Sequence, residues 1–86
     1  MHTVLITDDN ELIRETLEKA LVSEGYRVRL AKDGRECLDA VRTGDVDLIL
    51  LDMRLPDING LEVLQRLRQE QSDSIVLMMT AYGDVE

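Results

Sequence analysis

Four short apolar stretches recur along the 86-residue chain, at residues 3–7, 27–31, 46–52 and 74–79. The third includes four consecutive aliphatic residues, 48–51, with no polar alternation. That pattern is typical of a strand buried on both faces of a parallel sheet. The second stretch alternates arginine with apolar residues, which predicts an edge strand with one wet side. The fourth stretch predicts another buried strand.

Three intervening segments carry apolar residues at helical spacing, each preceded by a residue that can cap a helix. The expected helices and N-caps are residues 11–24 after Asn10, 34–42 after Asp33 (with Glu36 completing a capping box), and 60–70 after Asn59. The side chains expected to face the core are Leu12, Ile13, Leu17, Ala20 and Leu21 in the first helix, Cys37, Leu38 and Val41 in the second, and Leu61, Leu64 and Leu67 in the third.

Strands and helices therefore alternate, with short connections. This order predicts parallel strands, right-handed crossovers and an open α/β sheet with helices on both faces. In such a sheet the carboxyl ends of all strands meet at one edge, where ligands bind. Asp8 and Asp9 follow the first strand, Asp52 ends the third, and Thr80 follows the fourth. If the first and third strands are neighbours, three carboxylates converge there.

Three converging carboxylates need a physical explanation, because two unit charges about 4 Å apart repel by about 4 kcal/mol at an effective dielectric near 20. Either a proton is trapped among them or a divalent cation is held, and oxygen ligands with open water positions suit Mg²⁺. Asp52 could then act as a nucleophile that forms an acyl phosphate, with the Thr80 hydroxyl donating to a phosphoryl oxygen. The alternative is that Asp52 only ends its strand, Asp8 and Asp9 cap a helix, and Thr80 is a common strand-end residue.

The amino-acid composition limits the kinds of molecule that this chain is expected to bind. The formal net charge is -8, which disfavours direct contact with nucleic acid or an anionic membrane and is compatible with a cation or a basic partner. The single cysteine, Cys37, excludes an internal disulfide and is expected to be a small core residue. No apolar run approaches the roughly 20 residues of a membrane span, and the N-terminus lacks a signal peptide's basic start, so we expect a cytoplasmic protein.

Three sequence blocks, VLITDDN, LILLDMRLPDINGLEVL and IVLMMTAYGD, resemble the receiver domain of two-component response regulators in content, order and spacing. The resemblance implies a flavodoxin-like, doubly wound parallel sheet of strand order 2-1-3-4-5. It implies Asp52 as the phosphoacceptor, Asp8 and Asp9 binding Mg²⁺ directly or through water, and the backbone carbonyl of Arg54 as a further metal ligand. Thr80 would be the switch residue that contacts the phosphoryl group.

The same resemblance implies a function. A sensor histidine kinase would donate the phosphoryl group, and the domain would catalyse only its own transfer and slow dephosphorylation, so it would not be a metabolic enzyme. An output domain of the parent chain would receive the signal. The ending TAYGDVE resembles receivers of enhancer-binding transcription activators, which points to control of transcription.

The family pattern continues through a fourth helix, a fifth strand and a fifth helix, whereas the sequence stops at Glu86. We therefore expect residues 1–86 to be a receiver domain truncated at its C-terminus, without strand five, its lysine and helix five. Lys19 and Lys32 lie elsewhere in the pattern and do not replace that lysine. Residues 75–79 would then form an exposed sheet edge, and we expect self-association as a homodimer or a strand-exchanged assembly.

Two other functions stay open. A metal-dependent phosphohydrolase with an aspartyl nucleophile would need a second carboxylate soon after Asp52, and Met53 and Arg54 do not supply one. An interaction module that keeps the fold without taking phosphate is the other alternative. A stable phosphoaspartate would exclude the interaction module, and steady release of inorganic phosphate would favour the hydrolase.

Overall fold

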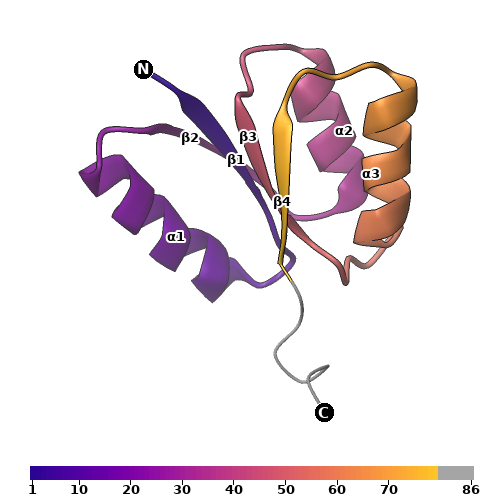
Figure 1. Ribbon diagram of the computed structural model, residues 1–86. Helices are drawn as coiled ribbons and strands as arrows, with labels where there is room; N and C mark the ends of the chain where they lie inside the picture. The colour runs from indigo at the N-terminus through magenta and orange to yellow at the C-terminus, as the bar shows by residue number, and fades with distance from the viewer. Residues whose placement is uncertain (80–86) are drawn as a thin grey trace.

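The computed structural model describes residues 1–79, in which four strands alternate with three helices (Figure 1). The elements are β1 (Thr3–Thr7), α1 (Glu11–Ser23), β2 (Arg27–Ala31), α2 (Gly34–Arg42), β3 (Leu48–Asp52), α3 (Gly60–Gln69) and β4 (Ile75–Met79). All neighbouring strands pair in parallel, in the order β2-β1-β3-β4. This confirms the predicted open parallel sheet and places β1 beside β3.

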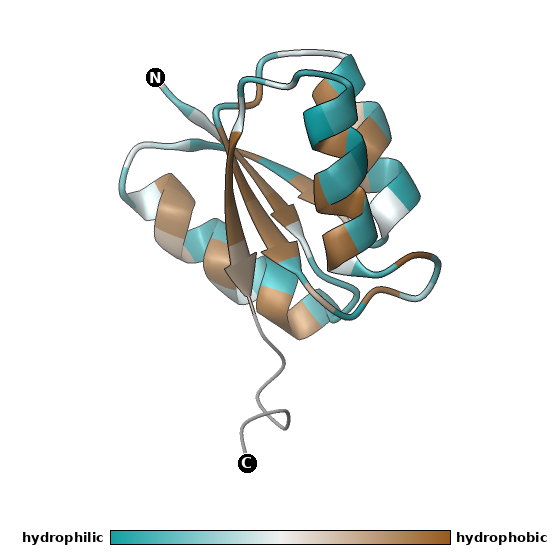
Figure 2. Cartoon of the chain, turned by 45° about the vertical axis from the view of Figure 1, so that its right-hand side comes forward, coloured by the Kyte–Doolittle hydropathy of each residue, from teal (hydrophilic) through white to brown (hydrophobic). Residues whose placement is uncertain are grey.

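Helices cover both faces of the sheet, with α1 on one side and α2 and α3 on the other (Figure 1). Figure 2 shows the strands as the most hydrophobic part of the chain, lying between the helices. Two buried clusters result. The larger, beneath α2 and α3, contains Leu5, Ala31, Cys37, Leu38, Ile49, Leu51, Val63 and Leu67. The smaller, beneath α1, contains Val4, Ile6 and Leu50. Cys37 is fully buried, as predicted for a core residue.

The predicted N-caps are confirmed, because each cap side chain accepts a hydrogen bond from a backbone N–H three residues later. The bonds run from Ile13 to Asn10 (3.2 Å), from Glu36 to Asp33 (2.8 Å) and from Glu62 to Asn59 (2.8 Å). Each satisfies a donor that the first helical turn leaves without a partner. The predicted helix starts follow from these caps.

The predicted apolar face of α1 is partly wrong. Leu17 and Leu21 pack against the smaller core, whereas Leu12 is 70% exposed, Ile13 is 41% exposed, and Ala20 is also exposed. The partly buried residues of the helix are instead Arg14, Leu17, Glu18 and Leu21. The helix is therefore rotated so that a charged residue, rather than the first two aliphatic residues, faces the rest of the domain.

The predicted inward face of α3 also needs correction, since Leu61 is 52% exposed and Val63 is fully buried. Gly60 sets this rotation. A Cβ atom at Gly60 would lie 2.5 Å from the carbonyl oxygen of Asp52, so the helix starts with its backbone against the end of β3. Residues 63 and 67 then follow on that face, and Leu61 points about 100° away from it.

Strand β4 is less buried than predicted. Val76 and Met78 pack against the larger core, but Ile75 is 69% exposed and Leu77 is 55% exposed. The exposed residues share the sheet face on which α1 packs against β1 and β2, and within residues 1–79 no element covers β4 there. Among the helices of residues 1–79, none combines the length and the apolar composition that a membrane-spanning helix requires.

Candidate functional site

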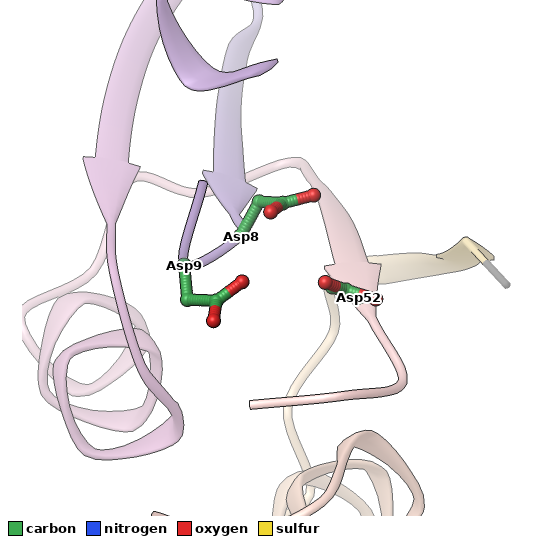
Figure 3. Close-up of side chains that lie close together, drawn as sticks. All are labelled: Asp8, Asp9 and Asp52. Atoms are coloured by element: carbon green, nitrogen blue, oxygen red, sulfur yellow. The ribbon is translucent and has the colours of Figure 1, made fainter. Parts of the chain in front are cut away.

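Three carboxylates meet where β1 and β3 end (Figure 3). Asp8 and Asp9 follow β1, and Asp52 is the last residue of the neighbouring strand β3. One carboxylate oxygen from each residue lies within 4.8 Å of the others. The predicted convergence of these side chains is therefore confirmed. It follows directly from the parallel pairing of two strands that are far apart in sequence.

Asp8 is held by three hydrogen bonds and is only 5% exposed. Its N–H donates to the carbonyl of Ala31 (3.1 Å), its Oδ1 accepts from the N–H of Asn10 (2.9 Å), and its carbonyl accepts from Arg14 Nη1 (2.7 Å). Asp9 follows as an exposed residue. The turn thus combines a buried, hydrogen-bonded carboxylate with an exposed one.

Asp52 is partly buried, and its Oδ1 accepts a hydrogen bond of 3.2 Å from the N–H of Arg54. Loss of hydration raises the pKa of Asp52, and the nearby charges of Asp8 and Asp9 raise it further, against the opposing effect of the Arg54 N–H. Repulsion by the two neighbouring charges therefore accounts for part of this rise in the pKa of Asp52. A bound cation would relieve it.

The ligand chemistry fits Mg²⁺. The three side chains offer only carboxylate oxygens, which are hard ligands, and together they carry a charge that a divalent ion would largely neutralise. Around an octahedral ion with bonds of about 2.0–2.1 Å, ligand oxygens lie about 2.9 Å apart when adjacent and about 4.1 Å apart when opposite. The carboxylate oxygens of the three residues lie up to 4.8 Å apart. They could therefore bind one ion if the side chains moved slightly closer together, or if one carboxylate bound the ion through a water molecule.

The loop after Asp52 is clamped at both ends. The N–H of Met53 donates to the carbonyl of Met79 (3.1 Å), and its carbonyl accepts from the N–H of Gly60 (2.9 Å). Further along, the carboxylate of Asp57 accepts from the N–H groups of Gly34 and Arg35 at the start of α2, both at 2.9 Å. These bonds hold the segment that carries Arg54 between β4, α2 and α3.

Local spacing in the sequence gives no signal for this role of Asp57, because its partners lie more than 20 positions earlier in the chain. Although partial desolvation raises it, the N–H groups of Gly34, Arg35 and Ile58 hold the pKa of Asp57 below its ordinary value. Asp57 therefore serves the start of α2 as a second capping carboxylate beside Asp33.

Two further residues were predicted to belong to the site, Thr80 and Arg54. Thr80 lies outside the described residues. The carbonyl of Arg54 stays a predicted metal ligand, on a residue whose N–H already contacts the Asp52 carboxylate. The domain is thus a three-layer α/β fold whose acidic site lies at the carboxyl edge of the two central strands.

Comparison with known proteins agrees with this fold and with the position of its acidic site. Residues 4–86 match the model of the response regulator receiver domain. The chain is 40% identical to the response regulator MprA of Mycolicibacterium vanbaalenii and 45% identical to YkoG, an uncharacterized transcriptional regulatory protein of Bacillus subtilis. Each alignment covers 95% of this chain and 36% of the relative. The chain thus spans about a third of the length of these relatives.

Among solved structures, the response regulator TrrA of Thermotoga maritima, in complex with Mg²⁺ and BeF, superposes with a TM-score of 0.90 at 38% sequence identity. The match covers 98% of this chain and 73% of TrrA. The chain belongs to the response regulator receiver domain family, which accounts for both its strand order and its acidic site.

The capping role of Asp57 can be tested by Asp57→Ala. We expect a loss of about 1 kcal/mol in the free energy of unfolding at pH 7, because two N–H groups at the start of α2 lose their acceptor. Since the folded-state pKa of Asp57 is lowered, its stabilisation is complete above the unfolded-state pKa and is lost as the pH falls through the folded-state value. The difference between variant and wild type should therefore shrink below pH about 4.

Urea unfolding followed by circular dichroism at pH 7 and at acid pH would measure both effects. Asp73→Ala, at an exposed position before β4, is the matched control and should change little. Equal effects of the two substitutions would show that the Asp57 contacts do not stabilise the loop.

Proposed function

We propose that this chain is a phosphoacceptor switch of two-component signalling, in which Asp52 takes the phosphoryl group. The observation that carries the proposal is the convergence of Asp8, Asp9 and Asp52, within 4.8 Å, in a member of the receiver family. We further propose that these three carboxylates and the backbone carbonyl of Arg54 hold Mg²⁺. The Mg²⁺ complex of TrrA supports that assignment by similarity.

The proposed reaction follows from the chemistry of a carboxylate nucleophile. An ionised oxygen of Asp52 attacks phosphorus, so that a carboxylate O–P bond forms while the P–N bond of a phosphohistidine donor breaks. The departing imidazole keeps the electron pair of that bond and takes up a proton. Mg²⁺, when bound, supplies charge stabilisation for the phosphoryl oxygens. Asp8 and Asp9 hold the ion, and the Arg54 N–H orients the nucleophile.

Thr80 completes the proposal as the residue that contacts the phosphoryl group. Its hydroxyl can donate to a phosphoryl oxygen, so phosphorylation would favour one arrangement of the segment after β4 over another. The domain would catalyse its own phosphorylation and slow dephosphorylation, without turnover of a metabolic substrate. The proposed signal is therefore a shift in the populations of two arrangements, caused by the charge that the phosphoryl group adds at Asp52.

The partners are inferred from the family. A sensor histidine kinase would be the phosphodonor, and an output domain of the parent chain would receive the signal. Similarity to YkoG, a transcriptional regulatory protein, favours control of transcription as the output. We propose a cytoplasmic location and no direct contact with nucleic acid or membrane by this acidic segment. The interpretation of residues 1–86 as a truncated receiver domain stays a prediction.

A phosphohydrolase is less well supported. Such an enzyme needs a carboxylic acid near Asp52 to protonate the leaving group. Asp57, the nearest carboxylate further along the chain, accepts hydrogen bonds from α2, and a lowered pKa makes it a poor proton donor. An interaction module that takes no phosphate remains the second candidate, favoured by the exposed apolar residues of β4.

The proposal is tested by intact-mass spectrometry after incubation with acetyl phosphate and Mg²⁺. We expect one added phosphoryl group, lost when EDTA replaces Mg²⁺ and absent in Asp52→Asn. Asp45→Asn, an exposed carboxylate in the turn after α2, is the matched control and should be phosphorylated like wild type. Phosphorylation of Asp52→Asn would contradict the assignment, and steady release of inorganic phosphate would favour the hydrolase.

We also propose that the chain self-associates through the edge strand β4, where Leu77 is 55% exposed. Light scattering at high concentration should then give a mass above the 9.8 kDa of one chain. Leu77→Lys should restore the monomer, whereas Leu61→Lys, which changes a leucine of similar exposure on α3, should not. A monodisperse wild-type monomer would rule out this association.

A further inference from the structure

Arg14 reaches back from α1 to the turn that carries two of the three carboxylates. Its Nη1 donates to the carbonyl oxygen of Asp8 at 2.7 Å, across six positions of sequence. The side chain is partly buried, unlike those of Leu12 and Ile13. The rotation of α1 away from its predicted apolar face is what brings Arg14 to this position.

Neither the helix dipole nor packing against the core explains why position 14 is an arginine. Arg14 is the fourth residue of α1, close to the end of a helix where the macrodipole disfavours a cation. An aliphatic residue at this inward position would add to the core without that cost. The acceptor of Arg14 is a backbone oxygen of the acidic turn, which points to a role in the geometry of that turn.

The carbonyl of Asp8 needs a donor because of where the sheet ends. Strand β1 pairs with β2 from Thr3 and Arg27 to Thr7 and Ala31. The N–H of Asp8 makes one more bond, to the carbonyl of Ala31, and β2 ends there. The carbonyl of Asp8 therefore lies beyond the paired register, and the guanidinium of Arg14 supplies its donor in place of a strand.

This bond acts on the peptide group that joins Asp8 to Asp9. The Asp8 side chain is already fixed by the N–H of Asn10, so the orientation of the next peptide decides where the Asp9 carboxylate points. Asp9 is exposed, and its side chain is directed toward the space it shares with Asp52 (Figure 3). Fixing the peptide limits how far Asp9 can turn toward solvent.

We infer that Arg14 is a positioning residue of the metal site, which holds the Asp8–Asp9 peptide so that both carboxylates face Asp52. The inference rests on the proposed Mg²⁺ site. Residues that orient metal ligands commonly change metal affinity by 10- to 100-fold when they are replaced. The hydrogen bond of Arg14 goes to the backbone carbonyl of Asp8 and not to a carboxylate oxygen, so Arg14 acts on the metal ligands through the backbone.

The test is a calorimetric titration of Mg²⁺ into wild type, Arg14→Met, Arg14→Lys and the control Lys19→Met. Lys19→Met removes the same charge from an exposed position of the same helix, so it reports the long-range electrostatic effect alone. We expect Arg14→Met to raise the Mg²⁺ dissociation constant about tenfold and Lys19→Met to change it less than about twofold. Arg14→Lys should fall between them, because it keeps the charge and one possible donor.

A second readout does not involve the metal. In EDTA, the ¹⁵N shift of the Asp9 amide should change in Arg14→Met and not in Lys19→Met, since that amide shares the peptide group whose carbonyl loses its donor. Circular dichroism would confirm that the variants are folded at the titration temperature. If Arg14→Met does not fold, the Mg²⁺ affinity and the Asp9 amide shift of Arg14→Lys are compared with those of wild type.

The outcomes separate this inference from the proposed function. Wild type that binds no Mg²⁺ would contradict the metal site itself. Wild type that binds Mg²⁺ while Arg14→Met binds it as tightly as Lys19→Met, with an unchanged Asp9 amide, would overturn the positioning role and leave the metal site intact. If Arg14→Met does not fold, wild-type affinity in Arg14→Lys together with a shifted Asp9 amide would show that loss of the bond to Asp8 does not affect metal binding, and would also overturn the positioning role.

Discussion

Three carboxylates repel one another at the carboxyl edge of the sheet, and the contacts around them hold them together against that repulsion. Asp8, Asp9 and Asp52 bring their oxygens within 4.8 Å of one another, and the pKa of Asp52 is raised by burial and by its two neighbours. Such a group lowers stability unless a proton or a cation compensates it. This cost falls at the carboxyl edge of the sheet, where the divalent ion that we propose would offset the repulsion.

Several separate anchors maintain the arrangement against that repulsion. Parallel pairing of β1 with β3 sets the distance between the two halves of the site. The Asp8 turn is tied to β2 and to α1, while the loop after Asp52 is tied to β4, α3 and the start of α2. Because these anchors come from both faces of the sheet, the position of the carboxylates depends on the whole domain. A change in any one of these elements can therefore reach the site.

The sequence predicted the elements and the acidic site well, because their signals are local or topological. The caps Asn10, Asp33 and Asn59 each act three residues away, and the convergence of Asp8 with Asp52 follows from parallel strands alone. What the sequence could not give was the rotation of the helices. Gly60 starts α3 against the backbone of Asp52, and the inward face of α1 carries Arg14, which bonds to the backbone of Asp8. Hydrophobic spacing gives no signal for contacts with the backbone.

Polar contacts between residues far apart in the sequence also could not be predicted from local sequence patterns. Asp57 reads as an ordinary turn residue, and only the assembled sheet shows that its carboxylate meets the start of α2. The exposure of Ile75 and Leu77 likewise depends on which helix covers which part of the sheet. A strand composed only of aliphatic residues and methionine gives no indication of that coverage.

We propose Asp52, and neither of the two carboxylates beside it, as the residue that carries the phosphoryl group. Borohydride reduces an acyl phosphate to an alcohol and leaves free carboxylates unchanged, so peptide mass mapping after phosphorylation and reduction identifies the modified residue. We expect reduction at Asp52 alone. Reduction at Asp8 or Asp9, or at no residue in protein that has gained a phosphoryl group, would exclude Asp52 as the phosphoacceptor.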